Sequence, residues 1–130
     1  MIFEMNYSQI RMPTRTPDTL LPLKHSTFRV LLALADGELH GYAVMQALSE
    51  ITGGRETILP GTLYAALARM VDDGMIETRE GPADDSSGGP KRRYYRRTEF
   101  GRAVARAESE RLRALLEIAQ AQNIFSGDTK

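Results

Sequence analysis

One segment of the sequence restricts the possible folds more than any other: a strand–loop–strand pattern that lies between helical stretches. Residues 75–80 (MIETRE) predict a short strand, and residues 91–97 (KRRYYRR) predict a second extended segment with two tyrosines. The residues between them (GPADDSSGGP) are turn formers or polar, and none is an apolar residue larger than Ala83. The segment therefore predicts one β-hairpin with a long polar tip.

Helical periods precede this hairpin. Apolar residues spaced for a 3.6-residue period predict helices over about 26–35, over about 40–52 and from about Pro60 to Gly74. Ser26 or Thr27 is expected to cap the first helix, and Pro60 suits the first turn of the third. The expected buried stripes are Phe28, Leu31, Leu32 and Ala35 in the first helix, Val44, Leu48 and Ile51 in the second, and Leu63, Leu67, Met70 and Val71 in the third.

The segment between the second and third expected helices and the C-terminal segment also contain structural signals. Gly53-Gly54 is expected to end the second helix, and Thr57 to Leu59 to add a short strand before the third. Thr98 is expected to cap a last helix over about 99–122, longer than about 30 Å and more than so small a domain can cover. One face of this helix is apolar and is expected to pair with a second copy of the chain, through Leu112, Leu115, Leu116 and Ala119.

This order of elements predicts a mainly α fold with a small β-hairpin, a winged helix-turn-helix followed by a long C-terminal dimerisation helix. The expected division is a flexible arm over 1–19, the winged-helix DNA-binding domain over 20–98, the dimerisation helix over 99–125 and a tail over 126–130. Leu20, Leu21 and Leu23, around Pro22, are expected to dock on the body of the domain.

The charge distribution indicates a polyanion as partner. The 17 basic and 17 acidic residues cancel, but residues 91–113 hold 9 basic and 3 acidic side chains. The third helix carries mostly small side chains on its expected outward face, Thr62, Ala65, Ala66, Arg69 and Asp73, so it can approach the DNA major groove closely.

Other classes of protein find little support. The chain has no cysteine and only two histidines, which excludes zinc fingers, disulfide frameworks and thiol nucleophiles. No catalytic constellation is present, so we expect neither an enzyme nor a cofactor. The longest apolar run, Val30 to Ala35, is too short to cross a bilayer, and the N-terminus lacks a secretory signal, so a soluble, cytoplasmic protein is expected.

Three blocks of sequence, HGYAVMQALSE at 40–50, PGTLYAALARMVDDGMI at 60–76 and KRRYYRRTEFGR at 91–102, closely resemble the PadR family of bacterial transcriptional regulators in order and spacing. The single C-terminal helix is similar to that of the shorter, homodimeric members. The resemblance implies a repressor that binds a near-palindromic operator as a homodimer and leaves it when a small-molecule effector or another signal shifts the dimer.

The resemblance also suggests site residues. Thr62 and Tyr64 would contact DNA through their hydroxyls, while Leu63 and Leu67 hold the helix to the core. The expected DNA-contacting residues are Thr62, Tyr64, Arg69, Lys91, Arg92, Arg93 and Tyr94. Arg97 departs from the family pattern, which has an apolar residue there. It indicates a less buried strand or a contact with the partner subunit or DNA.

The sequence allows more than one interpretation for the role of several residues and for the function of the protein. Tyr94 and Tyr95 point to opposite faces of a strand, and Tyr95 is expected to be the buried one. Tyr42 is interpreted as a core aromatic with a solvated hydroxyl, although the family pattern places it near the DNA-binding face. His40 is interpreted as a helix-start residue, and Arg69 either as a phosphate contact or as a partner of Asp72 or Asp73. The alternatives to a PadR-like regulator are a winged-helix protein–protein interaction module and a regulator of the multiple-antibiotic-resistance type.

Overall fold

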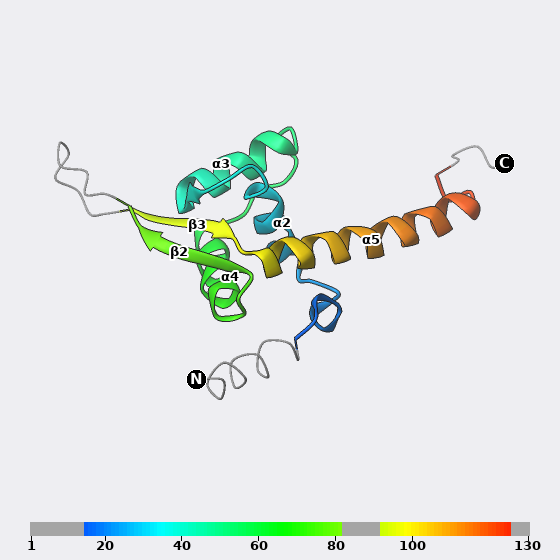
Figure 1. Ribbon diagram of the computed structural model, residues 1–130. Coiled ribbons are helices and arrows are strands. Elements are labelled where there is room, and N and C mark those ends of the chain that lie inside the picture. Colours follow the sequence, from blue (N-terminus) through cyan, green and yellow to red (C-terminus); the bar gives the residue numbers. More distant parts are fainter. Residues whose placement is uncertain (1–14, 82–91, 126–130) are drawn as a thin grey trace, which may run out of the picture.

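The computed structural model describes residues 15–81 and 92–125, and these form a helical body with a small sheet and one projecting helix (Figure 1). The elements in chain order are η1 (Pro17–Leu20), α2 (His25–Ala33), β1 (Leu39–His40), α3 (Gly41–Ile51), α4 (Pro60–Asp72), β2 (Ile76–Glu80), β3 (Arg93–Arg97) and α5 (Glu99–Ala121). The winged helix-turn-helix fold with a long C-terminal helix is therefore confirmed. Within the described ranges no helix is long and apolar enough to span a bilayer.

The sheet is antiparallel, with strand order β1-β3-β2. β2 and β3 form the predicted hairpin, with Ile76 opposite Arg97 and Glu80 opposite Arg93. The third strand is β1, in which Leu39 lies opposite Tyr95. The prediction of a strand at Thr57 to Leu59 is wrong. There the Arg29 guanidinium donates to the carbonyl oxygen of Thr57 at 2.8 Å.

The helix α2 lies at the centre of the core and contacts α3, α4 and α5. The predicted stripe of this helix is wrong in part, because contact with three helices buries a different face, which comprises Thr27, Val30, Leu31, Ala33 and Leu34. Phe28 is half-buried, and Leu32 and Ala35 are exposed. The predicted caps are also wrong, since α2 begins one residue earlier and Lys24, at its N-cap, makes no side-chain cap hydrogen bond.

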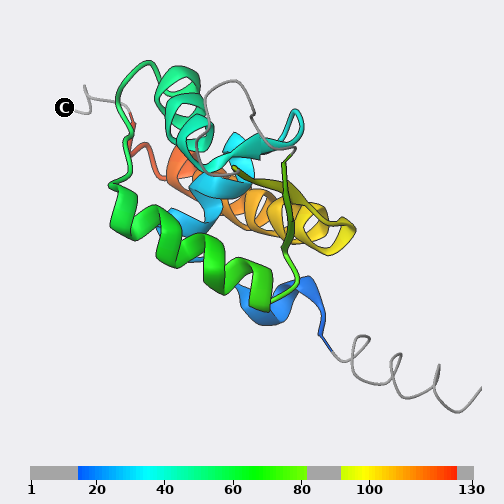
Figure 2. The same ribbon diagram turned by 90° about the vertical axis from the view of Figure 1, so that its left-hand side faces the viewer.

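In Figure 2 α3 lies above α4, and α2 lies between them and contacts both helices. His40 is the N-cap of α3, as predicted, and its Nδ1 accepts a hydrogen bond from the Ala43 N–H. Gly53 and Gly54, with φ of 64° and 84°, end α3 as predicted. Ile51, expected in the buried stripe, is exposed at this end of α3.

Thr98 caps α5 as predicted, because its hydroxyl accepts a hydrogen bond from the Gly101 N–H at 2.9 Å. Gly101 itself is required there, since a Cβ at this position would collide with the Met75 carbonyl. Leu20, Leu21 and Leu23 pack against the core as expected, and η1, within the segment expected to be an arm, contacts α5. Residues 1–14 of that arm and the expected tail at 126–130 lie outside the described residues.

Candidate nucleic-acid interface

The first turn of α4 is open to an external acceptor. Its N-cap residue, Leu59, makes no side-chain cap hydrogen bond, and Pro60 takes the first helical position. The first N–H groups of a helix have no partner within the helix, and the helix dipole makes this end attractive to anions. Pro60, Gly61 and Thr62 are all exposed. The start of α4 can therefore accept a phosphate group.

One face of α4 is buried in the core and the opposite face is exposed. Leu63, Ala66, Leu67 and Met70 are buried in the core. The exposed face carries Thr62, Tyr64, Ala65, Ala68 and Arg69. Ala66, which we expected on the outward face, is only 5% exposed because it shares the core side of the helix with Leu63 and Met70. The outward face is nevertheless slim, as a helix entering the major groove requires.

Tyr64 leans across to the start of α3, and a glycine makes room for it. A Cβ at Gly41 would lie 2.5 Å from the Tyr64 hydroxyl oxygen and 2.9 Å from two of its ring carbons. Tyr64 is 48% exposed and lines a surface hollow at this junction. Two of the sequence blocks, at 40–50 and 60–76, thus meet at one point of the surface.

A hollow of about 360 Å³ surrounds this junction, and side chains from α3, α4 and the wing line it, including His40, Tyr42, Tyr64, Arg92 and Arg93. The Arg92 guanidinium lies 3.4 Å from Nε2 of His40. Because Nδ1 of a neutral His40 accepts the Ala43 N–H, its Nε2 carries the proton and is a donor like the guanidinium. Two donors that meet without an acceptor between them suit an anionic oxygen.

The register of β3 divides the predicted wing residues between two faces. Arg93 shares a face with Tyr95, and Tyr94 lies on the other face with Arg96. Tyr95 is buried, as predicted, and burial raises the pKa of its hydroxyl. The half-buried ring of Tyr94 packs edge-on against His40 and lies 5.0 Å from the Arg79 guanidinium carbon. Tyr94 therefore has a packing role on this side of the wing.

Two other arginines of the wing already have carboxylate partners. Arg79 donates two hydrogen bonds to Glu38, at 2.6 and 2.9 Å, and these bonds lower the pKa of Glu38 and raise that of Arg79. Arg96 pairs with Glu77 at 2.6 Å. Among the described residues, Arg92 and Arg93 have no carboxylate within ion-pair distance and are both exposed. Within the part of the wing that the structure describes, these two arginines are therefore available to a polyanion.

The remaining predicted residues are placed as follows. Arg69 is exposed in the last turn of α4, and Asp73, one of its two expected partners, instead lies 3.9 Å from Arg15. Lys91 lies outside the described residues. Tyr42 was predicted as a core aromatic, which is wrong: it is 58% exposed because the second position of α3 faces the hollow. The family pattern, which places Tyr42 near the DNA-binding face, was the signal that pointed to its exposure.

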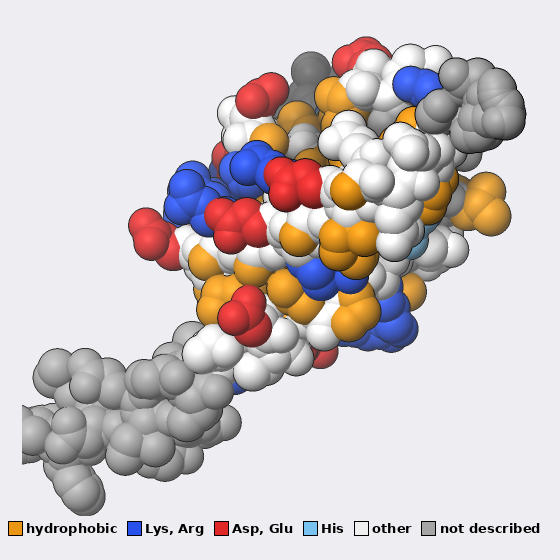
Figure 3. Space-filling model, turned by 90° about the vertical axis from the view of Figure 1, so that its right-hand side faces the viewer, with side chains coloured by type: hydrophobic (Ala, Val, Ile, Leu, Met, Phe, Trp, Pro, Cys, Tyr) orange, Lys and Arg blue, Asp and Glu red, His pale blue; other side chains and the backbone are white. Residues whose placement is uncertain are grey.

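The C-terminal half of α5 projects beyond the body of the domain (Figure 1), and the apolar side chains on one face of it are exposed. Leu112, Leu115 and Leu116 are 38%, 51% and 50% exposed, and Ala119 is half-buried. With Phe28 they line a shallow groove of about 610 Å³. From the side toward which α5 projects, several clusters of hydrophobic side chains are visible at the surface (Figure 3). The apolar side chains exposed on α5 are more numerous than those that a surface helix of a monomeric protein usually exposes.

An exposed slim helix beside a wing with free cations defines the winged-helix class of DNA-binding proteins. The family model of the PadR-like transcriptional regulators matches residues 30–107, and the chain belongs to this family. Members of the family are transcriptional regulators and not enzymes.

Two relatives and one solved structure are similar to this chain. The chain is 41% identical over 91 residues to the transcriptional regulator Rv3488 of Mycobacterium tuberculosis. This match covers 70% of this chain and 76% of that protein. It is 56% identical over 41 residues to an uncharacterized 37.1 kDa protein of transposon TN4556 from Streptomyces fradiae, and this match spans 32% of the chain and only 11% of that protein. The crystal structure of Bacillus subtilis PadR in complex with operator DNA has the same fold, with a TM-score of 0.57, 21% identity, and coverage of 65% of this chain and 46% of that one.

Proposed function

We propose that this chain is a homodimeric repressor that binds a near-palindromic operator, with α4 in the major groove and the wing arginines on the adjacent backbone, and that a small-molecule effector releases it. In this proposal residues 20–98 are the DNA-binding unit, 99–125 the dimerisation helix, 1–19 an accessory arm and 126–130 a tail. Transcriptional regulation is the function of the family to which the chain belongs.

The main support for this DNA interface is that several groups able to bind an anion lie on the same surface. The open first turn of α4, the Tyr64 hydroxyl and the guanidinium groups of Arg92 and Arg93 come from separate parts of the chain. Half or more of protein–DNA hydrogen bonds go to phosphate and sugar, and they set the position of the protein on the duplex. Thr62 and Arg69, on the exposed face of α4, are proposed as the further contacts, with Lys91 at the wing.

The dimer is supported by the apolar stripe of α5. Burying Leu112, Leu115, Leu116 and Ala119 against a second copy removes apolar area from water that the described part of the chain leaves exposed. Two-fold symmetry then sets two α4 helices roughly 34–36 Å apart, one turn of DNA, and a symmetric protein requires a near-palindromic site.

The test begins with immunoprecipitation of the protein with genomic fragments, followed by binding titrations on the enriched site between 50 and 200 mM salt. If the dimer neutralises about six to ten phosphates, affinity should fall roughly 10³- to 10⁵-fold over this range. Failure to enrich any fragment, or binding to it no tighter than to unrelated DNA of equal length, would contradict the proposal.

Charge variants separate DNA binding from protein docking. Arg92→Glu with Arg93→Glu should abolish operator binding, whereas Arg79→Glu with Arg96→Glu, which changes the net charge by the same amount, is the matched control because these two arginines are already paired with Glu38 and Glu77. An Arg92 and Arg93 double variant that still represses the target gene would instead favour a winged-helix protein–protein interaction module.

A further inference from the structure

Leu59, the residue that directly precedes α4, is an apolar side chain in an exposed position. It is 73% exposed, whereas its neighbour Ile58 is buried in the core. Among the large hydrophobic side chains that the structure describes, none is more exposed. In Figure 2 the loop after α3 reaches the start of α4 at the edge of the molecule, and this is the end of α4 that we propose enters the DNA groove.

The stability of α4 does not explain a leucine at its N-cap. Serine, threonine, asparagine and aspartate are preferred there, because their side chains accept a hydrogen bond from a free N–H group of the first turn. Leu59 makes no side-chain cap hydrogen bond. It takes part in the helix through its carbonyl oxygen, which accepts a hydrogen bond from the Leu63 N–H at 2.9 Å. Any residue at this position would supply that oxygen.

Gly61, two residues further on, is a second residue that weakens the start of α4. Glycine is less favourable than alanine within a helix. The backbone does not require it here, because positive φ is found at other glycines and not at Gly61. A Cβ at this position would meet no atom beyond its own turn of the helix within 4 Å. The missing side chain therefore leaves room for another molecule to come close.

An apolar side chain at the start of a helix in the major groove has one chemical match among the base edges. All four bases present hydrogen-bond donors or acceptors there, and only thymine also presents a methyl group. In helix-turn-helix proteins the N-terminal residues of this helix are the ones that meet base edges. Contact between a leucine and the thymine methyl group removes apolar surface of both from water.

We propose that Leu59 contacts the 5-methyl group of a thymine in each operator half-site and thereby selects a T·A pair at that position, while Gly61 lets the helix come close to the bases. This inference rests on the proposed binding of α4 in the major groove. It adds a residue that distinguishes sequences, whereas Arg92 and Arg93 are proposed to contact the sugar–phosphate backbone, which every sequence shares.

The test replaces thymines of the enriched operator by deoxyuridine, at two symmetry-related positions at a time. Deoxyuridine lacks the methyl group but keeps the base-pairing edge, so only the proposed contact is removed. We expect one pair of positions at which the wild type binds about 15-fold more weakly, from roughly fourfold for each methyl group. In Leu59→Ala the same replacement should change the affinity less than about twofold.

Ile51→Ala is the matched control, because Ile51 is another exposed aliphatic side chain and is the last residue of α3. This variant should keep the full response to deoxyuridine. The proposal is overturned if no thymine position loses its response in Leu59→Ala, or if Ile51→Ala loses the response equally.

Leu59→Ser separates base recognition from a structural role. Serine can cap α4, so the thermal stability of the protein should stay equal or rise. The response to deoxyuridine should nevertheless disappear, as in Leu59→Ala. A less stable Leu59→Ser protein that still responds to deoxyuridine would assign Leu59 a structural role and overturn the proposal.

Binding to the unmodified operator distinguishes failure of this inference from failure of the proposed function. A wild type that binds the operator with the expected salt dependence, but shows no thymine position coupled to Leu59, contradicts the inference alone. A wild type that binds no DNA contradicts both.

Discussion

Gly41→Ala tests whether the junction of α3 and α4 positions Tyr64 for DNA. The new Cβ would lie 2.5 Å from the Tyr64 hydroxyl oxygen, about 1 Å closer than ordinary contact, so the ring must move. The atoms it meets are the far end of a flexible side chain rather than backbone, and the fold can accommodate the change.

Gly41→Ala should weaken operator binding but leave the thermal stability of the protein equal or higher. Gly41 is the first residue of α3, where alanine is a better helix former by up to about 1 kcal/mol, so thermal stability should stay equal or rise. A displaced Tyr64 no longer donates its hydrogen bond to a charged phosphate, which costs about 1.5–3 kcal/mol, or roughly 10- to 150-fold in operator affinity for each protomer.

A double-mutant cycle with Tyr64→Phe provides the assay. Operator affinity and thermal unfolding are measured for the wild type, both single variants and the double variant. If the alanine acts through the Tyr64 hydroxyl, its effect on affinity should nearly disappear once that hydroxyl is absent. Strictly additive losses, or an alanine variant that binds DNA as tightly as the wild type, would refute this reasoning.

Three further perturbations address the other parts of the molecule. Leu112→Ser with Leu116→Ser removes roughly 1 kcal/mol of apolar burial for each half-exposed leucine and should give monomers with weak DNA binding; light scattering that finds an intact dimer would refute the interface. Arg92→Gln with Arg93→Gln should lower the slope of log affinity against log salt by about one for each phosphate that the variant no longer neutralises, and an unchanged slope would place the phosphate-binding residues elsewhere. The hydrogen bond from Arg111, opposed by burial, lowers the pKa of Glu108 below 4.5, so its ionised form stabilises the fold above about pH 4.5 and this contribution is lost as the pH falls further. Melting temperatures of the wild type and Glu108→Gln should therefore differ at pH 7 and converge toward pH 3, whereas a constant difference would contradict the assigned role.

Local sequence patterns were sufficient for most of the architecture. Glycines that adopt positive φ, a proline in the first helical turn and Thr98 at an N-cap mark element ends through backbone chemistry that does not depend on the rest of the fold. The face that α2 buries depends on contacts with three other helices, and an apolar spacing along one helix does not contain that information. For the same reason β1 was missed, because two residues become a strand only by pairing with β3.

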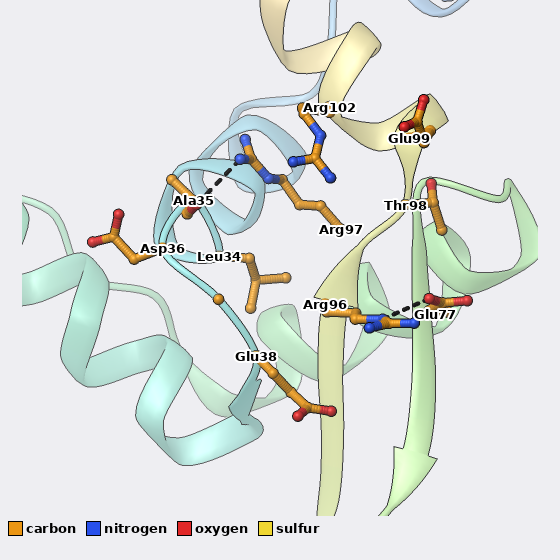
Figure 4. A pocket seen from close by; sticks show the side chains of 11 residues that line it. Leu34, Ala35, Asp36, Glu38, Glu77, Arg96, Arg97, Thr98, Glu99 and Arg102 are labelled. Atoms are coloured by element: carbon orange, nitrogen blue, oxygen red, sulfur yellow. Dashed lines mark hydrogen bonds and ion pairs between the residues drawn. The ribbon is translucent and has the colours of Figure 1, made fainter.

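The candidate site also contains residues that local sequence indicates and contacts that only the packing of the elements creates. Tyr64 was expected to contact DNA because of the resemblance to the family, whereas Thr62 and the basic residues of the wing were also indicated by their place on one helix face and in one extended segment, and their contact with DNA stays a prediction. The contact between Gly41 and Tyr64 and the exposure of Tyr42 arise only when α3 and α4 are brought together in space. Arg97 stood out in the sequence as a departure from the family pattern, but its hydrogen bond to the Ala35 carbonyl (Figure 4) forms only when the end of β3 is placed against the loop after α2.

Hydrogen–deuterium exchange of the full-length protein, free and bound to its enriched operator fragment, tests the central claim most directly. Helix-start amides exchange readily when they have no acceptor, and a bound phosphate slows them. We predict new protection in the first turns of α3 and α4 and at Arg92 and Arg93, with none in the first turn of α5. DNA-induced protection that spares α4, or that appears mainly on α5, would contradict the account.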